Sequence, residues 1–103
     1  MKPVAYICSP YRGDTYKHTI YARRLLKTAL QLGYAPICPH LYLTQVLNDN
    51  SPYEREQGLQ AGLALLQVCD VVIVGERYGI SEGMKAEIER AIELGRIIMH
   101  IVN

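Results

Sequence analysis

The chain has 103 residues, half of them hydrophobic, and a net charge of +1 from 11 Lys and Arg against 10 Asp and Glu. This length allows one domain, residues 1–103, and the hydrophobic content excludes an intrinsically disordered chain. The balanced charge excludes an electrostatic footprint for duplex nucleic acid or a membrane surface, and no apolar run approaches the roughly 20 residues of a spanning helix. Without a signal peptide, and with three cysteines that form no CxxC pair, we expect a cytoplasmic protein.

Strand and helix patterns alternate along the whole chain. Short β-branched apolar runs indicate buried strands, and longer stretches with apolar residues at helical spacing indicate helices. Ser51 and Ser81 are predicted N-caps, and Ser51, Pro52 and Glu54 have the pattern of a capping box. In chain order we predict a strand over 4–8, a helix over 15–32, a strand over 34–38, a short helix over 41–47, a helix over 52–68, a strand over 71–74, a helix over 82–94 and a strand over 96–102. The residues expected on buried helix faces are Ile20, Leu25, Leu26 and Ala29 in the first helix and Leu59, Leu63 and Leu66 in the third.

This alternation predicts an α/β fold of the flavodoxin or Rossmann type: a three-layer sandwich with a four-stranded parallel sheet and helices on both faces. Right-handed crossovers favour the strand order 2-1-3-4. In such a sheet, a ligand binds beyond the carboxyl ends of the strands, where the order reverses between strands 1 and 3. We therefore expect the binding site among the loops 9–15, 39–40 and 75–81.

Glu87 is the clearest candidate for chemistry. At about 100° per residue, it falls inside the apolar arc of the last helix, whereas the other three acids of that helix lie opposite. A carboxylate on an apolar face is costly unless it is paired, hydrogen-bonded or functional. Glu87 is therefore either a catalytic group or the partner of a neighbouring arginine, unless the helix is rotated. The residues of the arc are Met84, Ile88, Ala91, Ile92 and Leu94.

The loops at the expected binding edge supply polar groups. Ser9 and Arg12 are suited to bind phosphate, and Tyr11 is suited to stack on a base. The turn before the last helix offers backbone N–H groups, with Ser81 and Gly83, to an anion. The alternative explanation for this turn is a plain N-cap.

Other conspicuous residues have structural explanations. His40 ends the second strand, and a lone histidine is more often structural than catalytic. Asp70 opens the third strand, which places it at the opposite edge of the sheet. Gly58 and Gly62 allow either close helix packing or room for a substrate. No set of His, Cys and Asp residues has metal-ligand spacing, so we expect no metal.

Two segments resemble the nucleoside 2-deoxyribosyltransferases and the related 2′-deoxynucleoside 5′-phosphate N-hydrolases. Residues 6–11, Y-I-C-S-P-Y, are similar to the Y-L-A-G-P-Y that opens the transferases. Residues 81–91, S-x-G-x-x-x-E-x-x-x-A, resemble the segment that carries their nucleophilic glutamate. The resemblance covers nearly the whole chain in order, and the segment 48–59, N-D-N-S-P-Y-E-R-E-Q-G-L, is typical of a branch of small bacterial and phage proteins.

The resemblance implies an enzyme without a cofactor. Glu87 would attack the anomeric carbon of a (deoxy)nucleoside or nucleoside 5′-monophosphate, and the glycosyl group would pass to another base or to water. Arg12 would match an arginine of the hydrolases' first loop, and His40 a histidine after their second strand. Asn103 is expected to complete the site of a neighbouring subunit in a homodimer or larger homo-oligomer. The expected substrate-binding residues are Ser9, Tyr11, Arg12, His40, Ser81, Gly83 and Asn103.

The sequence departs from the family pattern in two places. The family's acid/base Asp, eight residues before the strand-opening Asp, falls on Gly62, and Lys85 stands where the hydrolases often have glycine. This favours an alternative, a catalytically inactive protein that binds or senses a nucleotide-derived ligand, and a purely structural or interaction protein is a third hypothesis. The residues that could replace the acid are Glu54, Glu56, Asp49 and His40.

Overall fold

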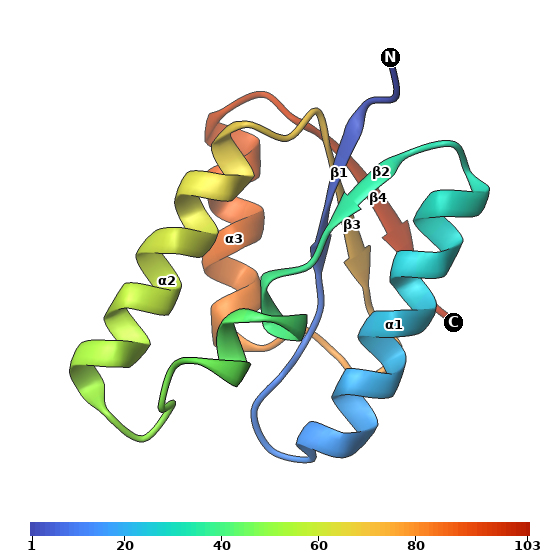
Figure 1. Cartoon of the computed structure of the whole chain (residues 1–103). Coiled ribbons are helices and arrows are strands. Elements are labelled where there is room, and N and C mark those ends of the chain that lie inside the picture. The colour runs from blue at the N-terminus through green and yellow to red at the C-terminus, as the bar shows by residue number, and fades with distance from the viewer.

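A four-stranded parallel sheet forms the middle layer of the protein, in a computed structural model that describes residues 1–103 (Figure 1). Its strand order is β2-β1-β3-β4, which confirms the predicted topology. The predicted fold class is also confirmed, because α1 covers one face of the sheet and α2 and α3 cover the other. The elements are β1 (Val4–Cys8), α1 (Thr15–Gln31), β2 (Ala35–Ile37), the 3₁₀ turns η1 (Pro39–Leu41) and η2 (Leu43–Gln45), α2 (Pro52–Gln67), β3 (Val71–Gly75), α3 (Glu82–Glu93) and β4 (Ile97–Ile101).

The two central strands explain why the sheet has a core on each face. Successive residues of β1 point to opposite sides, so Ile7 packs toward α1 and Tyr6 packs toward α2 and α3. All five residues of β3 are buried, as expected of a central parallel strand. Asp70 lies at the amino end of β3, where its carboxylate accepts a hydrogen bond from the Val4 N–H at 2.8 Å. Its structural interpretation, away from the site, is thus confirmed.

Three apolar residues predicted to be buried are instead exposed. Ile20 is 43% exposed because the buried stripe of α1 follows Tyr21 and Leu25. Leu59, also 43% exposed, lines a cavity rather than the core. Ile92 is 64% exposed because the neighbouring Ala91 occupies the inner face of α3.

The chain between β2 and α2 differs from the predicted short helix. It forms two 3₁₀ turns, because Tyr42 between them has a φ of −131°, which no α-helix accommodates. Ser51 then caps α2, with its hydroxyl accepting from the Glu54 N–H at 3.3 Å. The capping box is only half formed, because the Glu54 carboxylate accepts from the Asn48 N–H instead. No helix of the structure combines the length and the apolar character needed to cross a bilayer.

Candidate active site

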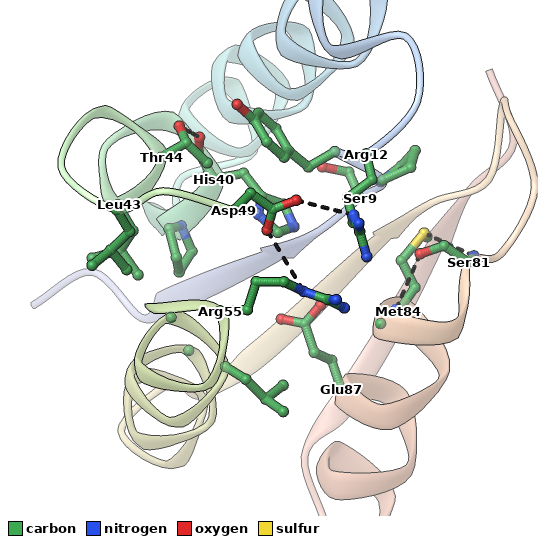
Figure 2. A pocket seen from close by; sticks show the side chains of 18 of the residues that line it. Ser9, Arg12, His40, Leu43, Thr44, Asp49, Arg55, Ser81, Met84 and Glu87 are labelled. Atoms are coloured by element: carbon green, nitrogen blue, oxygen red, sulfur yellow. Dashed lines mark hydrogen bonds and ion pairs between the residues drawn. The ribbon is translucent and has the colours of Figure 1, made fainter. Parts of the chain in front are cut away.

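A cavity of about 340 Å³ opens beyond the carboxyl ends of β1 and β2, next to the point where the strand order reverses between β1 and β3 (Figure 2). Its walls are the β1–α1 loop, the 3₁₀ turns, α2 and the first turns of α3. The volume lies at the lower end of the range for small-molecule sites and suits a ligand of nucleoside size. The cavity lies at the predicted edge of the sheet. Of the predicted loops, residues 9–12, residues 39–40 and Ser81 line it, whereas residues 13–15 and 75–80 do not.

Glu87 projects from α3 into the floor of the cavity and is only 8% exposed (Figure 2). One of its carboxylate oxygens accepts a hydrogen bond from the Tyr6 hydroxyl, and the other accepts from the Cys8 thiol at 3.8 Å. No arginine pairs with it, so the salt-bridge explanation is wrong. Burial raises the pKa of Glu87 to about 7, and the bonds from Tyr6 and Cys8 offset this rise only in part.

Tyr6 is a site residue that the sequence analysis did not identify. Its ring is 2% exposed on β1, and burial, with the negative charge of Glu87, raises the pKa of its hydroxyl far above the usual value. The hydroxyl therefore remains a donor to Glu87. A signal existed in the sequence, since Tyr6 and Cys8 are the residues with side-chain donors in an otherwise apolar strand.

Gly62 of α2 provides the space for this hydroxyl. A Cβ atom at Gly62 would lie 3.1 Å from Tyr6 Oη, so α2 packs closely there. A Cβ atom at Gly58, one turn earlier, would likewise lie 3.3 Å from Leu47 Cδ1. Both glycines line the cavity, so the two explanations offered for them, close packing and room for a ligand, apply together.

Tyr11 and His40 form one wall of the cavity. Their rings stack with centroids 5.5 Å apart and an interplanar angle of 22°. Burial lowers the pKa of His40, and hydrogen bonding to the Ser9 backbone offsets this only in part. The imidazole is therefore neutral at pH 7, and one face of Tyr11 is already covered.

Ser9 and the start of α3 contribute polar groups. Ser9 is fully buried, lines the cavity, and its hydroxyl has no hydrogen-bond partner. Such an orphaned group costs free energy unless a ligand or water satisfies it. The Ser81 hydroxyl caps α3 by accepting from the Met84 N–H at 3.3 Å. Gly83, in the same turn, has open space around its Cβ position.

Three charged residues meet at the mouth of the cavity. Asp49 lies between two arginines, with Arg12 Nε 3.0 Å from Oδ2 and Arg55 Nε 4.0 Å from Oδ1 (Figure 2). Arg12 was predicted from the sequence but Arg55 was not, because the position of α2 relative to the β1–α1 loop is a tertiary property.

Only some of the other residues predicted for the site line the cavity. Asp49, Glu54 and His40 line the cavity, whereas Glu56 does not. Asn103 is exposed after β4 and does not line the cavity of its own chain. No group of three or more His, Cys, Asp or Glu side chains is arranged to hold a metal ion.

The sequence matches, over residues 3–101, the model of a family described as a domain of unknown function (DUF7768). The chain belongs to this family. No curated protein sequence matches it. In this member of the DUF7768 family, the cavity holds one buried glutamate beside a tyrosine hydroxyl.

Two solved structures are similar to this DUF7768 chain. A 2-deoxyribosyltransferase from Bacillus psychrosaccharolyticus superimposes with a TM-score of 0.69 at 21% identity, covering 94% of this chain and 70% of its own. A 2-deoxyribosyltransferase from Leishmania mexicana has a TM-score of 0.61 at 16% identity, covering 96% of this chain and 63% of its own. The DUF7768 chain therefore spans less than two thirds of the length of the Leishmania protein. These likenesses confirm that the fold is that of the nucleoside 2-deoxyribosyltransferases.

Proposed function

We propose that this protein cleaves or transfers the N-glycosidic bond of a (deoxy)nucleoside or nucleoside 5′-monophosphate, with Glu87 as the nucleophile. The observation that carries the proposal is a lone buried carboxylate at the floor of a nucleoside-sized cavity, aligned by two neutral donors. The two similar structures are 2-deoxyribosyltransferases, which supports the same chemistry on this fold.

In the proposed reaction, an oxygen of ionised Glu87 bonds to C1′ while the C1′–N bond breaks. The negative charge stabilises the oxocarbenium-like transition state, and the resulting ester stores the sugar. Water or a second base then attacks C1′ and releases Glu87. The hydrogen bond from Tyr6 holds the attacking carboxylate in place, which makes Tyr6 a positioning residue.

A leaving base also needs a proton. Position 62 supplies none, because glycine has no side chain that could donate a proton. Of the residues considered as substitutes, three line the cavity, but burial favours the neutral form of His40, and Asp49 is engaged by two arginines. Glu54 is therefore the remaining candidate for the acid.

The test is chromatography for free base. Wild-type protein and the Glu87→Gln variant are incubated with deoxynucleosides, ribonucleosides and their 5′-monophosphates, with and without an acceptor base. We expect the wild type to release or exchange base and Glu87→Gln to lose at least 10³-fold in rate, roughly the loss seen when a covalent nucleophile is removed.

Glu89→Gln is the matched control, because Glu89 is an exposed residue of the same helix. It should retain wild-type activity. Equal release by wild type and Glu87→Gln would contradict the assignment of Glu87.

A second candidate function is a binding or sensing protein that does not turn over its ligand, which the glycine at position 62 favours. It predicts that nucleosides or nucleotides raise the melting temperature of the wild type although no base is released. A structural or interaction protein would show no stabilisation by either class of ligand.

We also propose a cytoplasmic homodimer or larger homo-oligomer in which Asn103 approaches the cavity of a neighbouring subunit. What supports association is the outer edge of β4, which pairs with β3 on one side only and starts with an exposed isoleucine, Ile97.

A further inference from the structure

The ionic cluster at the mouth of the cavity, formed by Arg12, Asp49 and Arg55, is not explained by a contribution to folding stability. Asp49 belongs to an exposed loop, and the side chains of Arg12, Arg55 and Asp49 are 60%, 50% and 45% exposed. Ion pairs this accessible to water contribute little to folding. The cluster nevertheless gathers two arginines from separate elements, the β1–α1 loop and α2, around one carboxylate beside the cavity.

The arginines are only partly satisfied by Asp49. The contact given for each ion pair is made by Nε, and the terminal nitrogens of the two guanidinium groups form no hydrogen bond within the protein, so they stay open to a ligand. The separation of 4.0 Å between Arg55 and Asp49 is also too long for a hydrogen bond. Figure 2 shows the guanidinium groups of Arg12 and Arg55 on different sides of the space between Asp49 and Glu87.

Other groups of the cavity favour an anion at this place. The orphaned hydroxyl of Ser9 lines the cavity, and so does the first turn of α3 with Gly83. A helix N-terminus attracts negative charge. Two further acids line the cavity, but Glu54 is held by the Asn48 N–H and Glu82 pairs with Lys85 at 3.2 Å.

We propose that Asp49 is an internal substitute for the phosphate of the substrate. In the free protein its single negative charge faces Arg12 and Arg55, and the phosphate monoester of a nucleoside 5′-monophosphate replaces it when the substrate binds. A phosphate has three oxygens and nearly two negative charges, so it satisfies both guanidinium groups where one carboxylate reaches only one. This inference rests on the proposed function and narrows its substrate to nucleoside 5′-monophosphates.

The test is calorimetric titration of the wild type, Asp49→Asn and Arg55→Gln with deoxynucleoside 5′-monophosphates, the matching deoxynucleosides and inorganic phosphate. Where base release is detected, the titrations are repeated in the Glu87→Gln background. Arg23→Gln is the matched control, because Arg23 is an exposed arginine of α1 that does not line the cavity.

We expect Asp49→Asn to tighten monophosphate binding by about tenfold, because it removes the competing charge, and Arg55→Gln to weaken it by about tenfold. Deoxynucleoside affinity should change much less in both variants, and Arg23→Gln should change neither. The tightening by Asp49→Asn should also shrink as salt is added, because the removed repulsion is electrostatic.

The inference is overturned if monophosphates bind no tighter than nucleosides, if Asp49→Asn weakens monophosphate binding, or if inorganic phosphate binds as tightly as the monophosphates. Base release from nucleosides alone would remove this inference and leave the proposed function. Conversely, the expected affinity pattern without any base release would remove the glycosidic chemistry and leave the phosphate site.

Discussion

At the scale of single residues, the burial of Glu87 links the site to stability. An unfolded chain ionises a glutamate near its ordinary pKa of 4.5, whereas burial raises the pKa of Glu87 to about 7. The folded state therefore binds more protons than the unfolded state between these values, and the free energy of unfolding must fall as pH rises through this window. The shift corresponds to roughly 3 kcal/mol.

We expect Glu87→Gln to remove this dependence. Glutamine can still accept from the Tyr6 hydroxyl but cannot ionise, so the variant should equal the wild type near pH 4.5 and exceed it in free energy of unfolding at pH 8. Urea titrations at several pH values measure this, with Glu89→Gln as the exposed control. Parallel pH curves for wild type and Glu87→Gln would contradict a raised pKa at Glu87.

The residues of the site differ in how far sequence could predict them. Glu87 was predictable because helical periodicity alone placed a carboxylate on an apolar face. The roles of Tyr6 and Arg55 were not, because each depends on tertiary packing: β1 against α3 for Tyr6, and α2 beside the β1–α1 loop for Arg55. Tyr6 reaches Glu87 across 81 positions of sequence, and no local pattern reports such a pair.

At the scale of elements, α1 packs closely against the end of β3 at Gly75. A Cβ atom at Gly75 would lie 2.4 Å from Leu25 Cδ1 and 2.8 Å from Tyr21 Oη. Both side chains are fully packed, and the Tyr21 hydroxyl also accepts from the Arg77 N–H at 3.2 Å. Alanine at position 75 would therefore displace the packed side chains of Leu25 and Tyr21.

We expect Gly75→Ala to lower the free energy of unfolding by about 1–3 kcal/mol, the usual cost of overpacking a core. Guanidinium titration measures the loss as a lower midpoint at an unchanged slope. Gly83→Ala is the matched control, because a Cβ atom there meets nothing within 4 Å, and alanine favours a helix. An equal midpoint for Gly75→Ala and the wild type would contradict the contact.

Element type was more predictable than element detail. Every strand and every α-helix was predicted, because strand runs and helical periodicity are local properties. The segment after β2 was predicted wrongly as one helix, since its two turns depend on the non-helical backbone of Tyr42. The exposure of Ile20 and Ile92 shows the same limit, because periodicity gives the direction of a face but not what covers it.

At the scale of the whole molecule, the topology assembles the site. The reversal of strand order leaves the carboxyl end of β1 between two diverging connections, and the cavity forms there. One wall comes from the β1–α1 loop and the turns after β2, and the other from α2 and α3. Asp70 is excluded from this site because it lies at the amino edge of the same sheet.

The outer edge of β4 gives the prediction for the whole molecule. Ile97 is 67% exposed and Val102 is 72% exposed, and no Lys, Arg, Asp or Glu interrupts residues 97–103. Edge strands of monomeric proteins usually carry such charges to prevent pairing with another chain. If β4 associates with a second copy, a lysine at position 97 should oppose the association, because its charge would have to be desolvated at the interface.

We therefore expect the wild type to sediment as a dimer or larger species at micromolar concentrations and Ile97→Lys to sediment as a smaller one. Val46→Lys is the matched control, since Val46 is a similarly exposed apolar residue, at 75%, on the β2 side of the sheet. Far-UV circular dichroism should be the same for all three proteins, so that a change in size is not a change in fold. A monomeric wild type, or an equal effect of the two lysines, would contradict association through β4 and with it the expected approach of Asn103 to a neighbouring cavity.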